Sequence, residues 1–391
     1  MDNIKIFVKK EWGLLLILFI MLLNPFYYGY RIAILFFFII FFQNQKYVVD
    51  FDRIFFFLFL FAGSYEIIGS MSMDKELNLV SIIPNIFIPS LLYLVGKRIS
   101  RTYKLDNIRI FFLFFISFSL SLIPLISIII QILKSGFELS DRSMYLIWDK
   151  GTEISATGLA SYFSLNLASV GLLNLSPKTY VQRKIHVSII ILFILSIICV
   201  IRLGSRTQLV IVVASFLVSY FLSFNRGHIL KKIFTIIIAV SIAVYFFITL
   251  SKLNEISILF QRGDASDYGI DTAGGRSVRW IDSFNSIFTD PWGWKFSRYG
   301  YAHNFWLDVA RVGGVIPLIF LIYITIASLK LYFKSFKILK KSHYLKIYIS
   351  LIFLSIFLGF NVEPVMEGMY LLFLIFCLMT GFLSGIVKVR V

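Results

Sequence analysis

Long apolar runs without a single charged residue are the feature that most constrains the fold of this chain. Three of them are Ile32–Phe42, Ile54–Ala62 and Ile189–Ile201. A stretch of about 20 predominantly apolar residues can cross a bilayer as a helix. Only helices and closed barrels satisfy their backbone polar groups inside lipid, and barrel strands alternate polar with apolar residues. These runs do not alternate, so the sequence predicts an all-α fold, a polytopic bundle of membrane helices.

The composition excludes an ordinary soluble globular protein. Hydrophobic residues make up 59% of the 391 residues and charged residues 15%, whereas soluble domains carry about 25% charged residues. Apolar runs bounded by charges predict about twelve spans in one polytopic transmembrane domain, residues 1–391, with a long outer loop, 251–302, inserted between spans. The predicted spans are Trp12–Leu23, Phe26–Phe42, Ile54–Ser70, Leu77–Val95, Ile110–Leu133, Thr157–Leu175, Val187–Ile201, Thr207–Phe224, Ile233–Leu250, His303–Leu329, Ile347–Phe360 and Gly368–Ile386.

The net charge of +17 is explained by the orientation of such a bundle. Lys and Arg are concentrated in alternate loops, for example between Lys97 and Arg109 and between Lys330 and Lys346. Because cytoplasmic loops are enriched in Lys and Arg, both termini are expected in the cytoplasm. The N-terminal apolar stretch is expected to be a retained helix because no small-residue cleavage pattern follows it. No nucleic-acid partner is expected.

The long loop contains the segment Gly274-Gly275-Arg276-Ser277-Val278-Arg279-Trp280. Apolar residues recur at helical spacing from Trp280 to Phe288, which predicts a short amphipathic helix suited to a membrane surface. Glycines let the backbone approach a ligand closely, and a helix N-terminus favours anions. Arg276 and Arg279 are therefore candidate anion ligands. The alternative is a solvated amphipathic helix that binds no ligand.

One histidine is a further candidate on the predicted outer face. Three of the four histidines fall among Lys and Arg in loops predicted to be cytoplasmic, and only His303 is predicted outside. A neutral imidazole can take a proton from a hydroxyl group near pH 7. His303 is therefore a candidate general base, with Tyr301 and Asn304 beside it. The alternative is a solvated histidine at the junction between a loop and a span.

A second pair of arginines, Arg202 and Arg206, flanks a short turn between two spans. Residues four apart share a face if the turn is helical. Arginine near the bilayer core costs about 2.5–3.5 kcal/mol on insertion scales, so this pair needs an explanation. One explanation is that both side chains reach headgroup phosphates. The other is a bidentate site for a phosphate or diphosphate, which guanidinium matches and lysine does not.

The sequence predicts no metal and no other cofactor. The outer-loop aspartates at 264, 267 and 271 lack the Asp-x-Asp spacing that would indicate a divalent ion. Cys199 and Cys377 lie in separate apolar runs and imply neither a disulfide framework nor a metal site. Asp308 and Arg311, three residues apart, are expected to pair with each other.

Three motifs follow one another along residues 202–314. They are Arg202-Leu203-Gly204-Ser205-Arg206-Thr207, then Gly275-Arg276 and Arg279-Trp280 with Asp290-Pro291-Trp292-Gly293, and last His303-Asn304-Phe305-Trp306-Leu307 with Gly313-Gly314. In these motifs the chain resembles the O-antigen polymerase and O-antigen ligase superfamily of bacterial envelope enzymes. The remainder is similar only as a polytopic bundle of comparable length. The family usually has a small residue or Tyr three places after the later glycine, where this chain has Pro317.

The resemblance implies a metal-independent, inverting glycosyltransferase of lipopolysaccharide or related surface polysaccharide biosynthesis, located in the bacterial inner membrane with its active site on the periplasmic face. Its implied substrate is an oligosaccharide carried on undecaprenyl diphosphate within the membrane lipid, and a chain-length regulator protein is a further partner to consider. The implied general base is His303, supported by Tyr301 and Asn304. The implied diphosphate ligands are Arg202, Arg206, Arg276 and Arg279.

Two alternatives stay open. A ligase of the same superfamily would transfer the glycan to lipid A–core, whereas a polymerase transfers it to an incoming repeat unit; the Phe- and Ile-rich composition and the length favour the polymerase. A flippase for the same lipid belongs to another class. Such transporters show internal repeats and interrupted helices near the midplane, and the sequence shows no paired interruptions.

Overall fold

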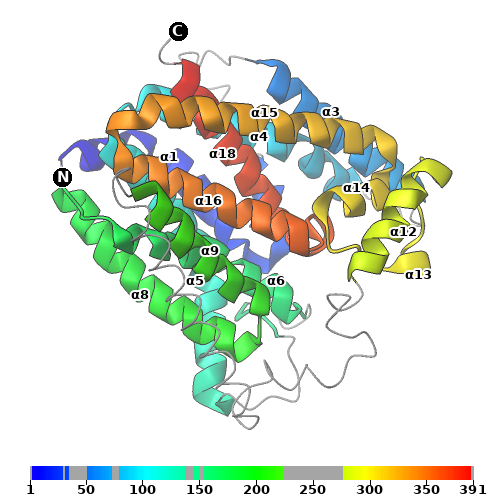
Figure 1. The fold of residues 1–391 in the computed structure, drawn as a ribbon, viewed down its shortest axis with the longest axis horizontal. Helices are drawn as coiled ribbons and strands as arrows, with labels where there is room; N and C mark the ends of the chain where they lie inside the picture. Colours follow the sequence, from blue (N-terminus) through cyan, green and yellow to red (C-terminus); the bar gives the residue numbers. More distant parts are fainter. Residues whose placement is uncertain are drawn as a thin grey trace. The chain divides into compact units, whose positions relative to one another are not determined.

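The described part of this computed structural model is helical (Figure 1). It covers residues 2–29, 31–34, 51–72, 79–136, 144–148, 153–223 and 276–388. Within these ranges the only β-type pairing is an isolated antiparallel bridge between Met144 and Ile154. The predicted all-α fold is confirmed for this part of the chain.

Internal contacts divide the chain into two compact units, each described by itself. The first consists of Met1–Ile116, Tyr268–His343 and Gly359–Val391, and the second of Ser117–Asp267 and Tyr344–Leu358. A single polytopic domain over residues 1–391 stays a prediction. The helices are α1 Asp2–Leu23, η1 Pro25–Tyr27, α3 Arg53–Ser72, α4 Leu79–Thr102, α5 Asp106–Ser135, α6 Ala156–Ser161, α7 Ser164–Ala168, η2 Ser169–Asn174, α8 Tyr180–Leu203, α9 Arg206–Ser223, α12 Arg276–Thr289, α13 Phe296–Tyr299, α14 Phe305–Gly313, α15 Val315–Ile338, η5 Leu339–Lys341, α16 His343–Val362, α17 Val365–Gly368 and α18 Tyr370–Lys388.

Eight of the described helices are long and apolar enough to cross a membrane, which indicates a multi-pass membrane protein. They correspond to eight of the twelve predicted spans. The predicted span Ile233–Leu250 and most of Phe26–Phe42 lie outside the described residues. The eight helical stretches are Arg53–Met71, Ile82–Thr102, Asp106–Ser135, Tyr180–Leu203, Arg206–Ser223, Val315–Lys341, His343–Val362 and Tyr370–Lys388.

The first predicted span, Trp12–Leu23, is the second half of a longer helix. Helix α1 begins at Asp2, so its first half also carries three lysines and Glu11. It is not among the eight candidate membrane helices. Glu11 is buried and accepts two contacts of 2.8 Å from the guanidinium group of Arg98 and a hydrogen bond of 2.9 Å from Tyr103 Oη.

The sixth predicted span, Thr157–Leu175, is wrong as a continuous helix. The structure divides it into the short pieces α6, α7 and η2. Serine hydroxyls in this segment donate to local carbonyls, from Ser161 to Gly158 and from Ser169 to Leu165. Such bonds compete with the regular helical ladder and bend it. Apolar composition alone does not reveal this competition, which is why the segment was predicted as one span.

The predicted span His303–Leu329 also differs from the structure. Helix α14 ends at Gly313, and the membrane-length helix α15 begins only at Val315. Between them Gly314 has a φ of 74°, and a Cβ there would collide with the carbonyl of Pro291. The backbone N–H of Val315 donates to that same carbonyl at 2.8 Å. His303 therefore lies before a separate short helix and not at the start of a span.

Close packing of α4 against α18 forms the core of the first unit. Cβ atoms added at Gly96, Gly381 or Gly385 would collide with backbone atoms of the facing helix. Without a hydrophobic driving force in lipid, small residues allow helices to approach and gain dispersion and polar contacts. Helix α3 packs against α4, and α15 packs against α3, where Phe57 stacks on Tyr323 with ring centroids 3.9 Å apart.

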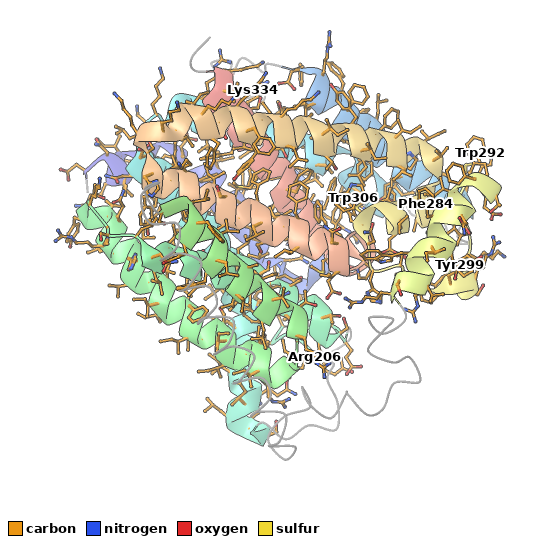
Figure 2. All side chains as sticks on the ribbon, in the orientation of Figure 1. Arg206, Phe284, Trp292, Tyr299, Trp306 and Lys334 are labelled. Atoms are coloured by element: carbon orange, nitrogen blue, oxygen red, sulfur yellow. The ribbon has the colours of Figure 1, made fainter. Side chains whose placement is uncertain are left out.

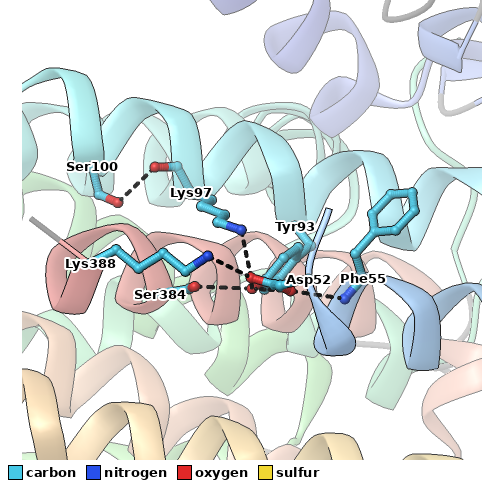
Figure 3. Close-up of polar contacts among 7 residues, drawn as sticks. All are labelled: Asp52, Phe55, Tyr93, Lys97, Ser100, Ser384 and Lys388. Atoms are coloured by element: carbon cyan, nitrogen blue, oxygen red, sulfur yellow. Dashed lines mark hydrogen bonds and ion pairs between the residues drawn. The ribbon is translucent and has the colours of Figure 1, made fainter. Parts of the chain in front are cut away.

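A partly buried ionic cluster joins the start of α3 to α4 and α18 at one end of the first unit (Figure 3). The carboxylate of Asp52 accepts from Lys97 Nζ at 2.5 Å and from Tyr93 Oη at 2.8 Å. Lys388 Nζ lies 3.6 Å from the same carboxylate, and Ser384 Oγ lies 3.0 Å from Tyr93 Oη. Each charge thus has an opposite charge or a hydrogen-bond partner, as burial requires.

The opposite ends of these three helices carry a different polar group of residues. Near the C-terminus of α3, Glu66 accepts from Asn85 of α4 at 2.9 Å, and Tyr370 at the start of α18 donates to the Asn85 carbonyl at 3.2 Å. Gly69 of α3 contacts Val312 of α14. The Asp52 cluster and helix α14 therefore lie at opposite ends of the α3–α4–α18 core.

The α4–α18 contact makes a prediction about stability. Replacing Gly381 with Leu inserts a side chain where the Tyr93 carbonyl already lies, and overpacking of this kind costs about 1–3 kcal/mol or more. The thermal midpoint of the purified protein in detergent should fall. Gly63→Leu on α3 is the matched control, because a Cβ at Gly63 meets no atom within 4 Å. Equal midpoints for the two variants would contradict this packing argument.

Candidate functional site

The turn before α14 is organised by one buried carboxylate. Asp308, in the first turn of α14, accepts from the backbone N–H of Ala302 at 2.8 Å and from that of Asn304 at 3.1 Å. Asn304 is the N-cap residue of α14, and its Oδ1 accepts from Leu307 N at 3.3 Å. The backbone is therefore fixed on both sides of His303.

His303 has a φ of 53°, in the left-handed region that non-glycine residues rarely adopt. That conformation costs roughly 1–2 kcal/mol, which the bonds to Asp308 on either side offset. The side chain is one quarter exposed, and its Nδ1 lies 4.0 Å from Oε2 of the buried Glu363. The backbone thus holds the imidazole in place, and Nδ1 has no hydrogen-bond partner among the described residues.

Helix α12 brings the two predicted loop arginines to this turn. Trp280 Nε1 donates to the carbonyl of Ala302 at 2.7 Å, which ties the helix to the residue before His303. Arg276 and Arg279 are both partly buried and lie close enough to His303 to influence its charge. The structure therefore brings together His303, Arg276 and Arg279, which are up to 27 residues apart in sequence (303 minus 276).

The surroundings of His303 favour its neutral form. Burial, followed by the positive charges of Arg276 and Arg279, lowers the pKa of His303 from 6.5 to about 4. An ionised Glu363 acts in the opposite direction, because it stabilises an imidazolium 4.0 Å away. At neutral pH the imidazole is uncharged and can accept a proton.

Beneath the turn, Arg311 is fully buried and joins three parts of the chain. Its guanidinium group forms an ion pair with Glu367 and lies 5.4 Å from the ring centroids of both Phe296 and Tyr301. Its Nε is 4.0 Å from Asp308 Oδ1, so the predicted Asp308–Arg311 pair is present as the longer of its two ion pairs. Burial raises the pKa of Asp308 to about 6.

Tyr301 and Asn304, the two predicted supporting residues, lie next to His303 in the structure. The ring of Tyr301 lies 6.1 Å from the imidazole and 4.7 Å from the ring of Phe296, measured between centroids. Burial raises the pKa of Tyr301, so its hydroxyl is protonated at neutral pH. Asn304 caps α14 as described above. A direct role for either residue in ligand binding stays a prediction.

Sequence analysis assigned no role to Glu363, which follows α16, or to Glu367, which lies within α17. Glu363 approaches His303, and Glu367 pairs with Arg311. One sequence signal could have pointed to these two residues. Both carboxylates lie in one short turn between two predicted spans, four residues apart, on the face predicted to be outside. Their contacts depend on tertiary packing, which spacing does not show.

Arg202 and Arg206 belong to the second unit, and their side chains differ in burial. Helix α8 ends at Leu203, and Gly204 follows in the left-handed conformation with a φ of 63°. The turn is therefore not helical, so the condition under which the two arginines would share a helix face is not met. Arg202 is 2% exposed and donates from Nε to the Gly136 carbonyl at 2.9 Å, whereas Arg206 is exposed. Both Nη atoms of Arg202 lack hydrogen-bond partners among the described residues.

Gly274 and Gly275, predicted to let the backbone approach a ligand, lie outside the described residues, and so do the aspartates at 264, 267 and 271, for which no metal was predicted. Among the residues that are described, no group of three or more His, Cys, Asp or Glu side chains is arranged to hold a metal ion. Whether the protein works without metal stays a prediction.

Comparisons with known proteins add no further assignment. No model of a known protein family matches the chain, and no curated protein matches it. The candidate site is therefore argued from its own geometry.

The pKa of His303 generates a testable prediction. Diethyl pyrocarbonate acylates only neutral imidazole, so its rate with a short reference peptide containing His303, of pKa about 6.5, should fall about tenfold between pH 7.5 and pH 5.5. In the folded protein the rate at His303 should stay nearly constant over this range, because a pKa of about 4 keeps the ring neutral. The readout is mass spectrometry of the modified peptide.

The double variant Arg276→Gln/Arg279→Gln serves as the internal comparison for that experiment. Removing both positive charges should move the pH dependence of the acylation rate toward that of the reference peptide. A tenfold fall in the acylation rate at His303 between pH 7.5 and pH 5.5 in the protein without these substitutions would contradict the low pKa assigned to His303.

Proposed function

We propose that this protein polymerises lipid-linked oligosaccharide repeat units at the His303 site, by transferring a glycan from undecaprenyl diphosphate to a sugar hydroxyl of an incoming unit. The motif resemblance supplies the substrate class. The observation that carries the proposal is the position of a neutral imidazole beside two arginines on α12. A base and a cationic group are the two components that such a transfer requires.

In the proposed reaction, the acceptor hydroxyl oxygen forms a bond to the anomeric carbon as the bond from that carbon to the diphosphate oxygen breaks. His303 takes the hydroxyl proton, which is worth about 10²–10⁴-fold in rate. Arg276 and Arg279 stabilise the negative charge that grows on the departing diphosphate. Attack opposite the leaving group inverts the anomeric centre, and neither step calls on a metal.

Substrate binding would prepare His303 for this role. A pKa of about 4 makes the imidazole a weak base, because efficient bases have pKa values near the working pH. A diphosphate bound to Arg276 and Arg279 would neutralise the charges that lower this pKa. Glu363, 4.0 Å from Nδ1, would then stabilise the imidazolium formed during the reaction. Donor binding and base strength are thus coupled through electrostatics.

The distribution of charge in the first unit supports an extracytoplasmic position for the site. Lys97 and Lys388 lie at the Asp52 end of the α3–α4–α18 core, and α15 runs from Val315, beside α14, to a lysine-rich C-terminal end. Basic residues mark the cytoplasmic end of membrane helices. On this basis we place the opposite end, which carries His303, on the periplasmic face of the inner membrane, and both termini in the cytoplasm.

The second unit contributes Arg202 to the proposal. A buried guanidinium group whose two Nη atoms have no hydrogen-bond partner among the described residues is suited to one anionic group, because each buried N–H without a partner costs free energy until it is bonded. We assign Arg202 to the phosphates of the lipid-linked substrate. Arg206 is exposed at the start of α9 and is better suited to lipid headgroups.

Two other functions remain as alternatives in the proposal. A ligase would use the same site with lipid A–core as acceptor. A flippase is favoured by one observation, the interrupted segment of α6, α7 and η2, because interrupted helices line substrate paths in transporters. Deletion in the native host with a gel of surface glycan separates these functions. One repeat unit per core indicates a polymerase, unmodified core with accumulated polymer indicates a ligase, and unmodified core with lipid-linked units retained in the cytoplasmic leaflet indicates a flippase.

The base assignment predicts that His303→Ala loses glycan polymerisation by about 10²–10⁴-fold, since proton removal from the acceptor is lost. The assay uses purified protein in lipid vesicles with synthetic undecaprenyl-diphosphate oligosaccharide, followed by a gel of product length. His186→Ala on α8 is the control and should retain activity. A correctly inserted His303→Ala protein with full-length product would remove His303 from the mechanism.

The anion assignment predicts that Arg276→Lys loses most activity in the same assay, because lysine keeps the charge but lacks the planar fork that binds phosphate oxygens in pairs. The loss should appear mainly in turnover of the donor lipid. Wild-type turnover in this variant would show that charge alone is sufficient and would argue against bidentate binding.

A further inference from the structure

Helix α12 has an unusual distribution of side chains over its two faces. The face toward the rest of the first unit carries Arg276, Arg279 and the buried Ser283 and Ser286. The opposite stripe, spaced as i, i+3 and i+7, is apolar and exposed. Its members Ile281, Phe284 and Phe288 are 62%, 55% and 73% exposed. A helix in water would have the reverse arrangement, with aromatic residues inside and arginines outside.

The C-terminal end of α12 is attached to the start of a membrane-length helix. The turn after α12 bonds directly to the junction of α14 and α15, with Val315 N donating to Pro291 O at 2.8 Å and Trp294 N donating to Arg311 O at 2.9 Å. Val315 is the first residue of a stretch long and apolar enough to cross a membrane. The exposed stripe of α12 therefore ends where the hydrocarbon region begins.

The apolar exposure continues on both sides of that junction. Trp292, in the attached turn, is 65% exposed, and Figure 2 labels it together with Phe284. On α15, Ile319, Ile322 and Ile326 are exposed as well, as expected for a helix that faces lipid. Exposed apolar patches of this size on a protein mark an interaction surface. Continuity with the exposed face of a membrane helix identifies lipid as the partner.

We infer that the exposed face of α12 is covered by acyl chains of the bilayer leaflet at the His303 end, which makes α12 an in-plane membrane helix. Amphipathic helices of this kind bury their apolar face about 5–10 Å into the boundary between headgroups and acyl chains. Arg276 and Arg279, on the other face, then lie near the depth of lipid phosphates. A lipid-borne anion reaches them from within the membrane. This inference does not depend on the transferase assignment.

The test measures the depth of single positions on α12 in the full-length protein. Phe284→Cys is made in a background with Cys199→Ala and Cys377→Ala, labelled with the fluorophore NBD, and reconstituted into phosphatidylethanolamine–phosphatidylglycerol vesicles. Asp282→Cys is the matched control. Asp282 is two residues before Phe284, so its side chain lies on the other side of the helix, where it is partly buried. NBD is then quenched either by nitroxide-labelled lipid or by aqueous iodide.

At Phe284 the nitroxide lipid should quench severalfold more strongly than iodide, with a blue-shifted emission, and at Asp282 this order should reverse. Stronger iodide quenching at both positions would overturn the inference. A second outcome would also overturn it: position 284 is protected from both quenchers, and two copies of the Phe284→Cys protein cross-link at that position. A second chain, and not lipid, would then cover the exposed face of α12. Photolabelling of the unmodified protein by a diazirine lipid checks the result without substitutions and should modify residues 280–289.

Discussion

The carboxylate of Asp308, buried under the turn that carries His303, is the interaction on which the rest of the candidate site depends. A buried carboxylate is stable only with hydrogen bonds or an opposite charge. Here the N–H groups of Ala302 and Asn304 supply the hydrogen bonds, and Arg311 lies 4.0 Å away. Because Arg311 also pairs with Glu367, the same network fixes the turn, α14 and α17. The left-handed conformation of His303 follows from these constraints on its neighbours.

The uncompensated positive charge on α12 gives this arrangement its chemical meaning. Among the described residues, no acidic side chain forms an ion pair with Arg276 or Arg279, and their charges lower the pKa of the neighbouring imidazole. An anion is the class of ligand that these two positive charges would favour. A diphosphate of the proposed lipid-linked substrate would offset the part of this pKa lowering that comes from the two arginines, whereas the larger part, from burial, would remain.

Sequence patterns predicted the membrane helices well because length and the absence of charge are sufficient to identify a span. They failed where local hydrogen bonds or backbone conformation decided the result, as in Thr157–Leu175 and at Gly314. Sequence reasoning selected His303, Arg276 and Arg279 as candidates, and the fold brings these three residues close together, although their roles stay predictions. Glu363 was missed because its approach to His303 comes from the end of a different helix, 60 residues later (363 minus 303).

The two ends of the α3–α4–α18 core show how structural and functional charge differ. At one end Asp52 is matched by Lys97, Lys388 and a tyrosine hydroxyl, so the cluster is neutralised internally and serves to hold helices together. At the other end Arg311 is matched by Glu367, but Arg276 and Arg279 have no such match among the described side chains. The inverted faces of α12 make the same distinction, since arginines that only anchored a helix would point toward lipid headgroups and not toward His303. The Asp52 cluster is compensated by side chains of the protein itself, whereas Arg276 and Arg279, which have no ion-pair partner among the described side chains, are the residues proposed to bind an anion.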